Sequence, residues 1–194
     1  TQEEIDAHKP APITFGEGYA ETPYTAASFF NVSAMSYGAL SGPAIAALST
    51  GAHQSGIWLN TGEGGLSPFH QTSPCDLVFQ IGTAKYGVRD ADGRLDPDKV
   101  AALAALPEVR MFEIKLSQGA KPGKGGILPG EKVTPVIAST RGIPAGQDSI
   151  SPNRHPEVTD APSLLDLIAQ VRDASGKPTG IKFVLGDANW LDDL

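Results

Sequence analysis

Short apolar runs that alternate with glycine-rich polar loops are the feature that most limits how this chain can fold. Six runs are predicted strands, at residues 30–34, 57–60, 77–81, 111–116, 149–150 and 180–185. Several are apolar at consecutive positions, which is typical of parallel strands buried on both faces. Helices are predicted at residues 42–55, 97–106, 130–139 and 163–175, with Ser41 and Asp96 as N-caps of the first two. This order of strand, loop and helix favours a parallel α/β domain.

Polar, glycine-rich loops follow four of the predicted strands, at residues 33–41, 60–65, 117–126 and 151–155. The carboxyl ends of parallel strands meet at one edge of a sheet, and in a barrel they form the face on which sites are built. We therefore expect the side chains of these loops to form a ligand site.

Composition excludes several classes of function. The net charge of −7 argues against nucleic acid as the main partner, because phosphate binding requires a basic face. The lone Cys75 cannot form an internal disulfide or an iron–sulfur cluster, and it indicates a partly buried thiol in a reducing compartment, the cytoplasm. No run approaches the roughly 18 apolar residues of a membrane span. His8, His53 and His70 do not have metal-ligand spacing, so no metal site is predicted.

Three polar side chains, those of Gln80, Lys115 and Lys182, lie inside apolar strand runs. A buried glutamine needs a hydrogen-bond partner, and a buried lysine is costly without an anion. A ligand that offers a hydrogen-bond donor to Gln80 and negative charge to the lysines would serve both. The alternative is that Gln80 faces water at an edge and that the lysines extend outward from strand ends.

Two groups of segments identify a family. Residues 33–41 (SAMSYGALS) and 60–65 (NTGEGG) resemble the FMN-binding domain of glutamate synthases, and residues 114–130 (IKLSQGAKPGKGGILPG) resemble the substrate loop of that domain. The likeness is strongest to the shorter bacterial members, which carry the barrel without a glutaminase domain. The resemblance implies an extended lead-in over residues 1–23, followed over residues 24–194 by about six of the eight strands of a (β/α)8 TIM barrel.

The resemblance also implies roles for individual residues. It places the FMN ring against Ala34, Met35, Ser36, Thr61, Gln80, Lys115 and Lys182, with the pyrimidine edge of the ring paired with Gln80 and a lysine near N1 and O2 to stabilise the charge of the reduced ring. It places Glu63, Gln118 and Lys121 at the border of a 2-oxoglutarate pocket. There Lys121 would attract a carboxylate, and Glu63 would position ammonia or move a proton. His155 is a further candidate to face the pocket.

The implied activity is that of an oxidoreductase acting on CH–NH2 donors. Hydride would pass from reduced FMN to 2-iminoglutarate, formed from 2-oxoglutarate and ammonia, and the product would be L-glutamate. The ammonia would be free or derived from glutamine, and electrons would come from a reductase or ferredoxin through a [3Fe–4S] cluster. The family's cluster cysteines and phosphate loops follow its sixth strand and have no counterpart in this sequence. We therefore expect this chain alone to bind FMN weakly or not at all.

Two positions depart from the family pattern. Ile127 stands where glutamate synthases usually have glutamine, and Lys124 stands where they commonly have glutamate. Because Ile127 cannot make the glutamine's hydrogen bond, a flavin reaction on another 2-oxo or 2-imino acid remains an alternative. A truncated chain that acts only as a binding or assembly module is the non-enzymatic alternative.

Overall fold

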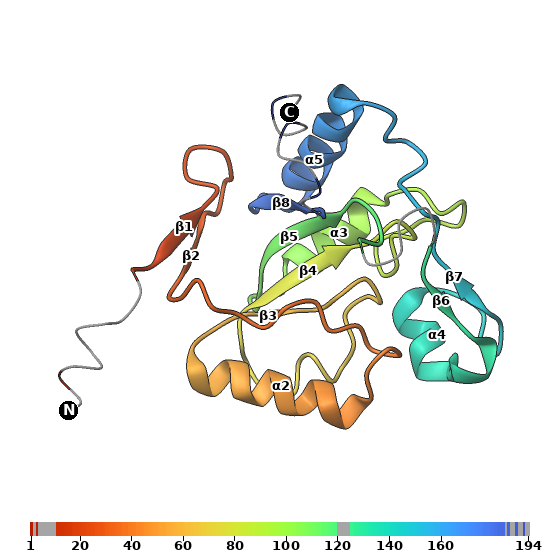
Figure 1. Ribbon diagram of the computed structural model, residues 1–194, viewed down its shortest axis with the longest axis horizontal. Coiled ribbons are helices and arrows are strands. Elements are labelled where there is room, and N and C mark those ends of the chain that lie inside the picture. Colours follow the sequence, from red (N-terminus) through yellow and green to blue (C-terminus); the bar gives the residue numbers. More distant parts are fainter. Residues whose placement is uncertain are drawn as a thin grey trace.

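A four-stranded parallel sheet lies at the centre of the computed structural model, which describes residues 1, 3, 11–119, 125–184, 186, 189 and 192 (Figure 1). Its strands, in spatial order, are β3 (Leu59–Asn60), β4 (Leu77–Ile81), β5 (Val109–Lys115) and β8 (Thr179–Lys182). A single parallel bridge from Val32 to Leu59 extends the β3 edge. The predicted α/β class is confirmed, and the open sheet is consistent with part of a TIM barrel; within the described residues it does not close.

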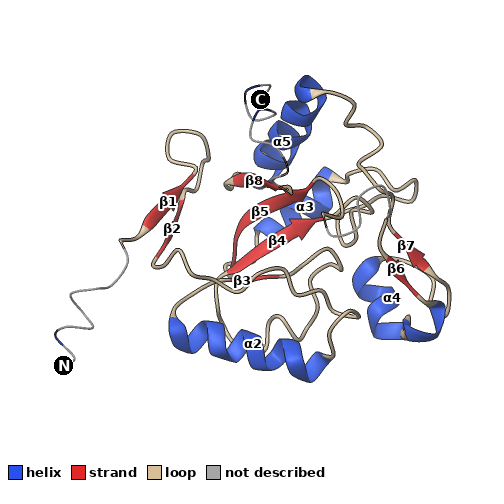
Figure 2. Ribbon diagram, viewed as in Figure 1, coloured by secondary structure: helices blue, strands red, loops and turns tan. Residues whose placement is uncertain are grey.

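Helices cover one face of this sheet (Figure 2). These are α2 (Gly42–Ser55), α3 (Pro97–Ala104) and α5 (Ala161–Ser175). The predicted caps are confirmed: Ser41 Oγ accepts from the Ala44 amide at 3.4 Å, and Asp96 accepts from the amides that follow Pro97. Because side chains alternate along a strand, Phe112 and Ile114 of β5 enter the core beneath the helices. The side chains of Glu113 and Lys115, which alternate with these two, therefore project from the opposite face.

An antiparallel hairpin closes the amino-terminal end of that opposite face. Its strands are β1 (Ile13–Phe15) and β2 (Tyr24–Ala26), and the first lies within the predicted lead-in. Tyr24 packs with Val78 of β4 and Met111 of β5, and Phe15 and Trp58 pack against this cluster. The hairpin thus covers the apolar side chains near the amino ends of the strands. The polar side chains on the same face, nearer the carboxyl ends, are left open for a site.

The strand predicted at Ser149–Ile150 exists but lies in a different sheet from the one expected. As β7 it pairs antiparallel with β6 (Ile127–Leu128), beside the 3-10 turn Gly130–Lys132 and α4 (Pro135–Arg141). Figure 1 shows this small unit to one side of the parallel sheet. The strand next to β5 is β8, which pairs with it through four residues, whereas β7 is only two residues long and pairs with β6. The prediction of a fifth barrel strand here was wrong.

The predicted strand at residues 30–34 is reduced to the bridge at Val32. The Asn31 side chain accepts from the Trp58 amide at 3.0 Å, so a side chain takes the place of a ladder bond. Phe29 and Phe30 are largely exposed, which removes the burial that favours a strand.

Candidate functional site

The loops after β3 and β5 bring three of the predicted residues together. The Lys115 ammonium lies 3.2 Å from Glu63 Oε2 and donates to Gln118 Oε1 at 3.0 Å. The Gln118 amide donates to both oxygens of Glu63, at 2.9 and 2.8 Å. The side chains of Lys115 and Glu63 are only 14% and 19% exposed. Each member therefore binds the other two in a partly buried cluster at the carboxyl end of the sheet.

Close packing of backbone and side chains fixes Glu63 in this cluster. Gly62 has a φ of 67°, and a Cβ there would lie 2.3 Å from Ser36 Oγ. A Cβ on Gly82 would lie 2.6 Å from the Cβ of Glu63. A side chain would clash at either position, which explains why glycine precedes Glu63 in the sequence and why glycine, as Gly82, packs against the Glu63 side chain.

A second polar group lies on the same face, one layer lower in the sheet. Glu113 Oε2 accepts from Asn60 Nδ2 at 2.9 Å and from the Gln80 amide nitrogen. Thr61 Oγ1 accepts from the backbone amide of Gln80 at 3.1 Å. Gln80 Oε1 is buried and finds no hydrogen-bond partner among the described residues. Gln80 is thus an interior residue rather than an edge residue that faces water, and it keeps one acceptor for a ligand.

Sequence reasoning missed Glu113 and Asn60. Glu113 stands two positions before Lys115 in an apolar strand, so the argument that selected the lysine would also have selected it. Lys182 pairs in register with Lys115 and lines a cavity of about 190 Å³ together with Ala34, Asn60 and Glu113. It therefore faces the lower polar group rather than Glu63.

The predicted ring-binding segment Ala34–Met35–Ser36 runs alongside the loop after β3. The Met35 amide donates to the Asn60 carbonyl at 3.1 Å, and His70 Nε2 donates to the Met35 carbonyl at 2.8 Å. The Ser67 amide donates to His70 Nδ1, which fixes the proton on Nε2. Burial lowers the pKa of His70, so the ring stays neutral. Because both backbone groups of Met35 are engaged, a ligand would meet its side chain or the neighbouring residues.

A cavity of about 300 Å³ opens beside the Glu63 cluster. It lies between the parallel sheet and the small unit, and its lining includes Ser36, Glu63, Gln118, Ile127, Lys132 and Arg141. The Arg141 guanidinium donates to Ser149 Oγ at 2.9 Å and to the Tyr37 carbonyl at 3.2 Å, and it lies 5.1 Å from the Tyr86 ring centre. Burial lowers the pKa of Arg141, whose Nε has no hydrogen-bond partner in the described part of the chain. The sequence carried no local signal for Arg141, because two of its three partners, Tyr37 and Tyr86, are distant along the chain.

Two further predictions have other outcomes. His155 is buried and donates to the Lys115 carbonyl at 2.9 Å; it is not among the residues that line this cavity. Lys121 lies outside the described residues. Across the described ranges, no three His, Cys, Asp or Glu side chains are grouped as a metal site would require. The helices of those ranges include none with the length and apolar character of a membrane span.

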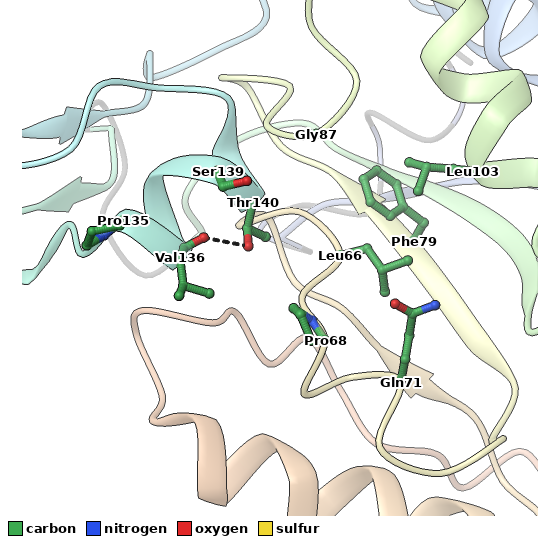
Figure 3. A pocket seen from close by; sticks show the side chains of 10 residues that line it. All are labelled: Leu66, Pro68, Gln71, Phe79, Gly87, Leu103, Pro135, Val136, Ser139 and Thr140. Carbon is green, nitrogen blue, oxygen red and sulfur yellow. Dashed lines mark hydrogen bonds between the residues drawn. The ribbon is translucent and has the colours of Figure 1, made fainter.

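A separate apolar groove of about 560 Å³ lies away from the cluster (Figure 3). Leu66, Phe79 and Leu103 line one side, and Pro135 and Val136 of α4 line the other. Residues 61–76, all of them described, connect β3 to β4 without a helix. None of the predicted site residues lines this groove.

Comparison with known proteins gives the family of the chain. The family described as "Conserved region in glutamate synthase" matches residues 4–190. The glutamate synthase large subunit-like protein YerD of Bacillus subtilis is 40% identical over 92% of the chain and 34% of its own length. The archaeal-type glutamate synthase [NADPH] of Thermotoga sp. is 40% identical over 77% of the chain and 27% of its own length, and a large subunit-like protein of Rhizobium meliloti is 33% identical over 88% and 36%. The chain therefore spans about a third of these relatives, and it belongs to the glutamate synthase family.

Proposed function

We propose that this chain is part of an FMN-dependent oxidoreductase that reduces 2-iminoglutarate, formed from 2-oxoglutarate and ammonia, to L-glutamate. The observation that carries the proposal is the Glu63–Lys115–Gln118 cluster at the edge of a cavity that Arg141 also lines. It joins an acid, a cation and an amide beside a space for a small anion. The names of the relatives place glutamate synthases in the same family.

The residues present fit the ring of FMN. Gln80 Oε1 is a buried acceptor without a partner in the described ranges, and it matches the N3–H donor of a flavin. Lys115 and Lys182 leave the same face of the sheet in register, which suits the N1 and O2 positions. When bound, reduced FMN would supply the hydride.

The chain's own groups would bind and orient the substrate. Arg141 and Lys132, which line the cavity, are suited to the two carboxylates of 2-oxoglutarate, with Lys121 as an additional ligand. Gln118 would donate to a substrate oxygen once it exchanges a bond with Glu63. The Glu63 carboxylate would accept from the nitrogen of ammonia or of the imine, and would move a proton to or from that nitrogen. Lys115 holds Glu63 in place for this role.

Ile127 supports a second candidate function. Its side chain lines the cavity, and the residue is 65% exposed. An apolar group at this wall would suit a 2-oxo acid with an apolar side chain better than one with a second carboxylate. The same hydride chemistry would then give a different amino acid.

The test uses the complete natural protein with FMN, a viologen reductant, 2-oxoglutarate and ¹⁵N-ammonium. We expect saturable quenching of FMN fluorescence and the formation of ¹⁵N-labelled L-glutamate. FMN binding without glutamate, together with turnover of an apolar 2-oxo acid, would favour the second candidate. Absence of FMN binding would contradict both.

The electron donor is proposed to be a reductase or ferredoxin, and the bracketed NADPH in the name of the Thermotoga relative supports a pyridine nucleotide as the source.

A further inference from the structure

We propose that His155 is a positioning residue, which fixes the carboxyl end of β5 and thereby holds the Lys115 ammonium against Glu63 and Gln118. His155 is 1% exposed, and its Nε2 donates to the Lys115 carbonyl at 2.9 Å. The inference rests on the proposed function only where it concerns what the cluster does to a substrate.

The Lys115 carbonyl needs a partner from outside the sheet. The pairing of β4 with β5 ends at Ile81 and Ile114, one residue before Lys115. On the other side of β5, the Leu116 amide donates to the Lys182 carbonyl at 3.0 Å. Backbone groups of successive residues point to alternate neighbours, so the Lys115 carbonyl points toward β4, beyond the last paired residue. His155 supplies the donor that the ladder does not provide.

The protonation of His155 makes it a fixed donor. A carbonyl can only accept, so Nε2 carries the hydrogen and Nδ1 holds a lone pair. Nδ1 is buried and has no hydrogen-bond partner in the part of the chain that is described. Burial lowers the pKa of His155 on balance; the hydrogen bond to the Lys115 carbonyl opposes this shift, as does Glu157, whereas the nearby Lys85 adds to it. The neutral ring therefore has one tautomer and one role.

The segment that carries His155 is anchored to the loop after β4. Thr83 Oγ1 donates to the Pro152 carbonyl at 2.6 Å, and the buried Lys85 ammonium lies 2.8 Å from Glu157 Oε1. Lys85 holds a left-handed backbone with a φ of 52°, which disfavours any residue except glycine unless its surroundings compensate. These anchors lie on either side of His155 and leave its ring little freedom to move.

The Lys115 ammonium depends on this arrangement because its carbonyl and its side chain belong to one residue. If the carbonyl were unpaired, the end of β5 would be free to shift, and the ammonium would move with respect to Glu63. Gln118, three residues further on, would move with it. The effect of His155 therefore reaches the cavity through Lys115, and His155 itself touches no ligand.

The test compares His155→Leu, His155→Gln and a matched control in the complete natural protein. Leucine removes the donor, whereas glutamine can place an amide N–H near the position of Nε2. The control is Lys177→Met, because Lys177 donates to the Leu106 and Val109 carbonyls at the opposite end of β5. The readout is competitive acetylation of the Lys115 amine, quantified by peptide mass spectrometry beside the melting temperature. It requires neither FMN nor substrate.

We expect His155→Leu to raise the acetylation rate of Lys115 about fivefold, as loss of a typical hydrogen bond would, and His155→Gln to restore a rate near that of the wild type. Lys177→Met should lower the melting temperature and leave the rate unchanged. Equal acetylation of Lys115 in His155→Leu and Lys177→Met would overturn the proposal. If His155→Leu does not fold, Glu157→Gln takes its place, because it breaks the Lys85–Glu157 ion pair that anchors the segment of His155. This variant must raise the acetylation rate of Lys115 by a smaller factor. An unchanged rate in Glu157→Gln would also overturn the proposal.

Activity then separates this proposal from the proposed function. In a protein that makes glutamate, His155→Leu should lower kcat about tenfold more than Lys177→Met does, because it disturbs the reacting cluster. A wild-type protein that binds no FMN would remove the proposed function. The acetylation result would still decide whether His155 positions Lys115.

Discussion

Lys115 and Lys182 stand directly opposite each other in the parallel pairing of β5 and β8, so their side chains leave the same face of the sheet. Lys115 is tied to Glu63, whereas Lys182 lines the cavity beside Asn60 and Glu113. Two neighbouring cations on one face are electrostatically costly unless an anion lies near them. Glu63 is that anion for Lys115, and Glu113 lines the same cavity as Lys182. Under the proposed function, the reduced flavin ring would add a further negative charge beside Lys182.

Substitution of Lys182 tests whether this lysine binds the FMN ring. We expect Lys182→Met to raise the Kd for FMN about tenfold, because a charged hydrogen bond to the ligand is lost. Fluorescence quenching measures the change. Lys99→Met, at an exposed helix position, is the matched control and should leave the Kd unchanged. Equal Kd values for Lys182→Met and the wild type would place Lys182 outside the FMN site.

Glu63 should matter more for the rate than for binding. Glu63→Gln keeps hydrogen-bonding atoms near Gln118 but removes the carboxylate that would move a proton. We expect kcat to fall about 100-fold or more and KM for 2-oxoglutarate to change little. Steady-state kinetics with the exposed Glu17→Gln as control checks this. A rise in KM at constant kcat would assign Glu63 to binding alone.

Ile127 decides between the two candidate substrates. For 2-oxoglutarate, Ile127→Gln adds a hydrogen-bonding group to the cavity wall, and we expect KM to fall about fivefold. For a 2-oxo acid with an apolar side chain, the same change should raise KM. An assay in which the two acids compete measures both changes in KM together. If Ile127→Gln changes KM for neither acid, Ile127 does not determine substrate specificity.

Gly62 should tolerate no side chain. Its positive φ and the 2.3 Å approach to Ser36 Oγ mean that Gly62→Ala must displace the segment that includes Met35. We expect a loss of about 1–3 kcal/mol in the free energy of unfolding. Urea denaturation measures it. Gly51→Ala, in the open middle of α2, should instead be neutral or stabilising, because nothing lies within 4 Å of the added carbon.

Two buried histidines predict how stability depends on pH. Burial lowers the pKa of both His70 and His155, whereas an unfolded histidine titrates near about 6.5. Between the lowered pKa and about 6.5 the unfolded chain binds more protons, so stability rises with pH in that window and falls as the solution is acidified through it. Melting temperatures from about pH 5 to pH 8 should show this slope. His70→Gln should flatten it, and an unchanged slope would contradict the assignment.

Much of the local structure follows from the sequence because its causes are local. The helix over Gly42–Ser55 has its cap at Ser41 and a left-handed glycine at its end, and the strand Leu77–Ile81 is apolar throughout. Both were predicted with correct bounds. Glu63, Lys115 and Gln118 were also predicted as site residues, and the structure brings them together. Their roles toward FMN and substrate remain predictions.

What sequence reasoning missed depends on distant partners. The β1–β2 hairpin is stabilised by Val78 and Met111, far along the chain. β7 is not part of the parallel sheet, because it pairs antiparallel with β6, which lies in the loop after β5. Arg141 is a buried residue that donates to the Tyr37 carbonyl, 104 residues away, so no local pattern marks it. His155 was named as a candidate residue, but its contact with the Lys115 carbonyl, 40 residues away, was not predicted. Such long-range polar contacts cannot be read from periodicity or propensity.

The most direct test of the central claim is an anaerobic single turnover. The complete natural protein is reduced with bound FMN and mixed rapidly with 2-oxoglutarate and ammonium, while flavin absorbance and glutamate are followed together. The account predicts flavin reoxidation that requires both reactants, with one L-glutamate formed for each flavin, and a much slower reaction in Lys115→Met. Bound, reduced flavin that stays reduced in the presence of both reactants would contradict it.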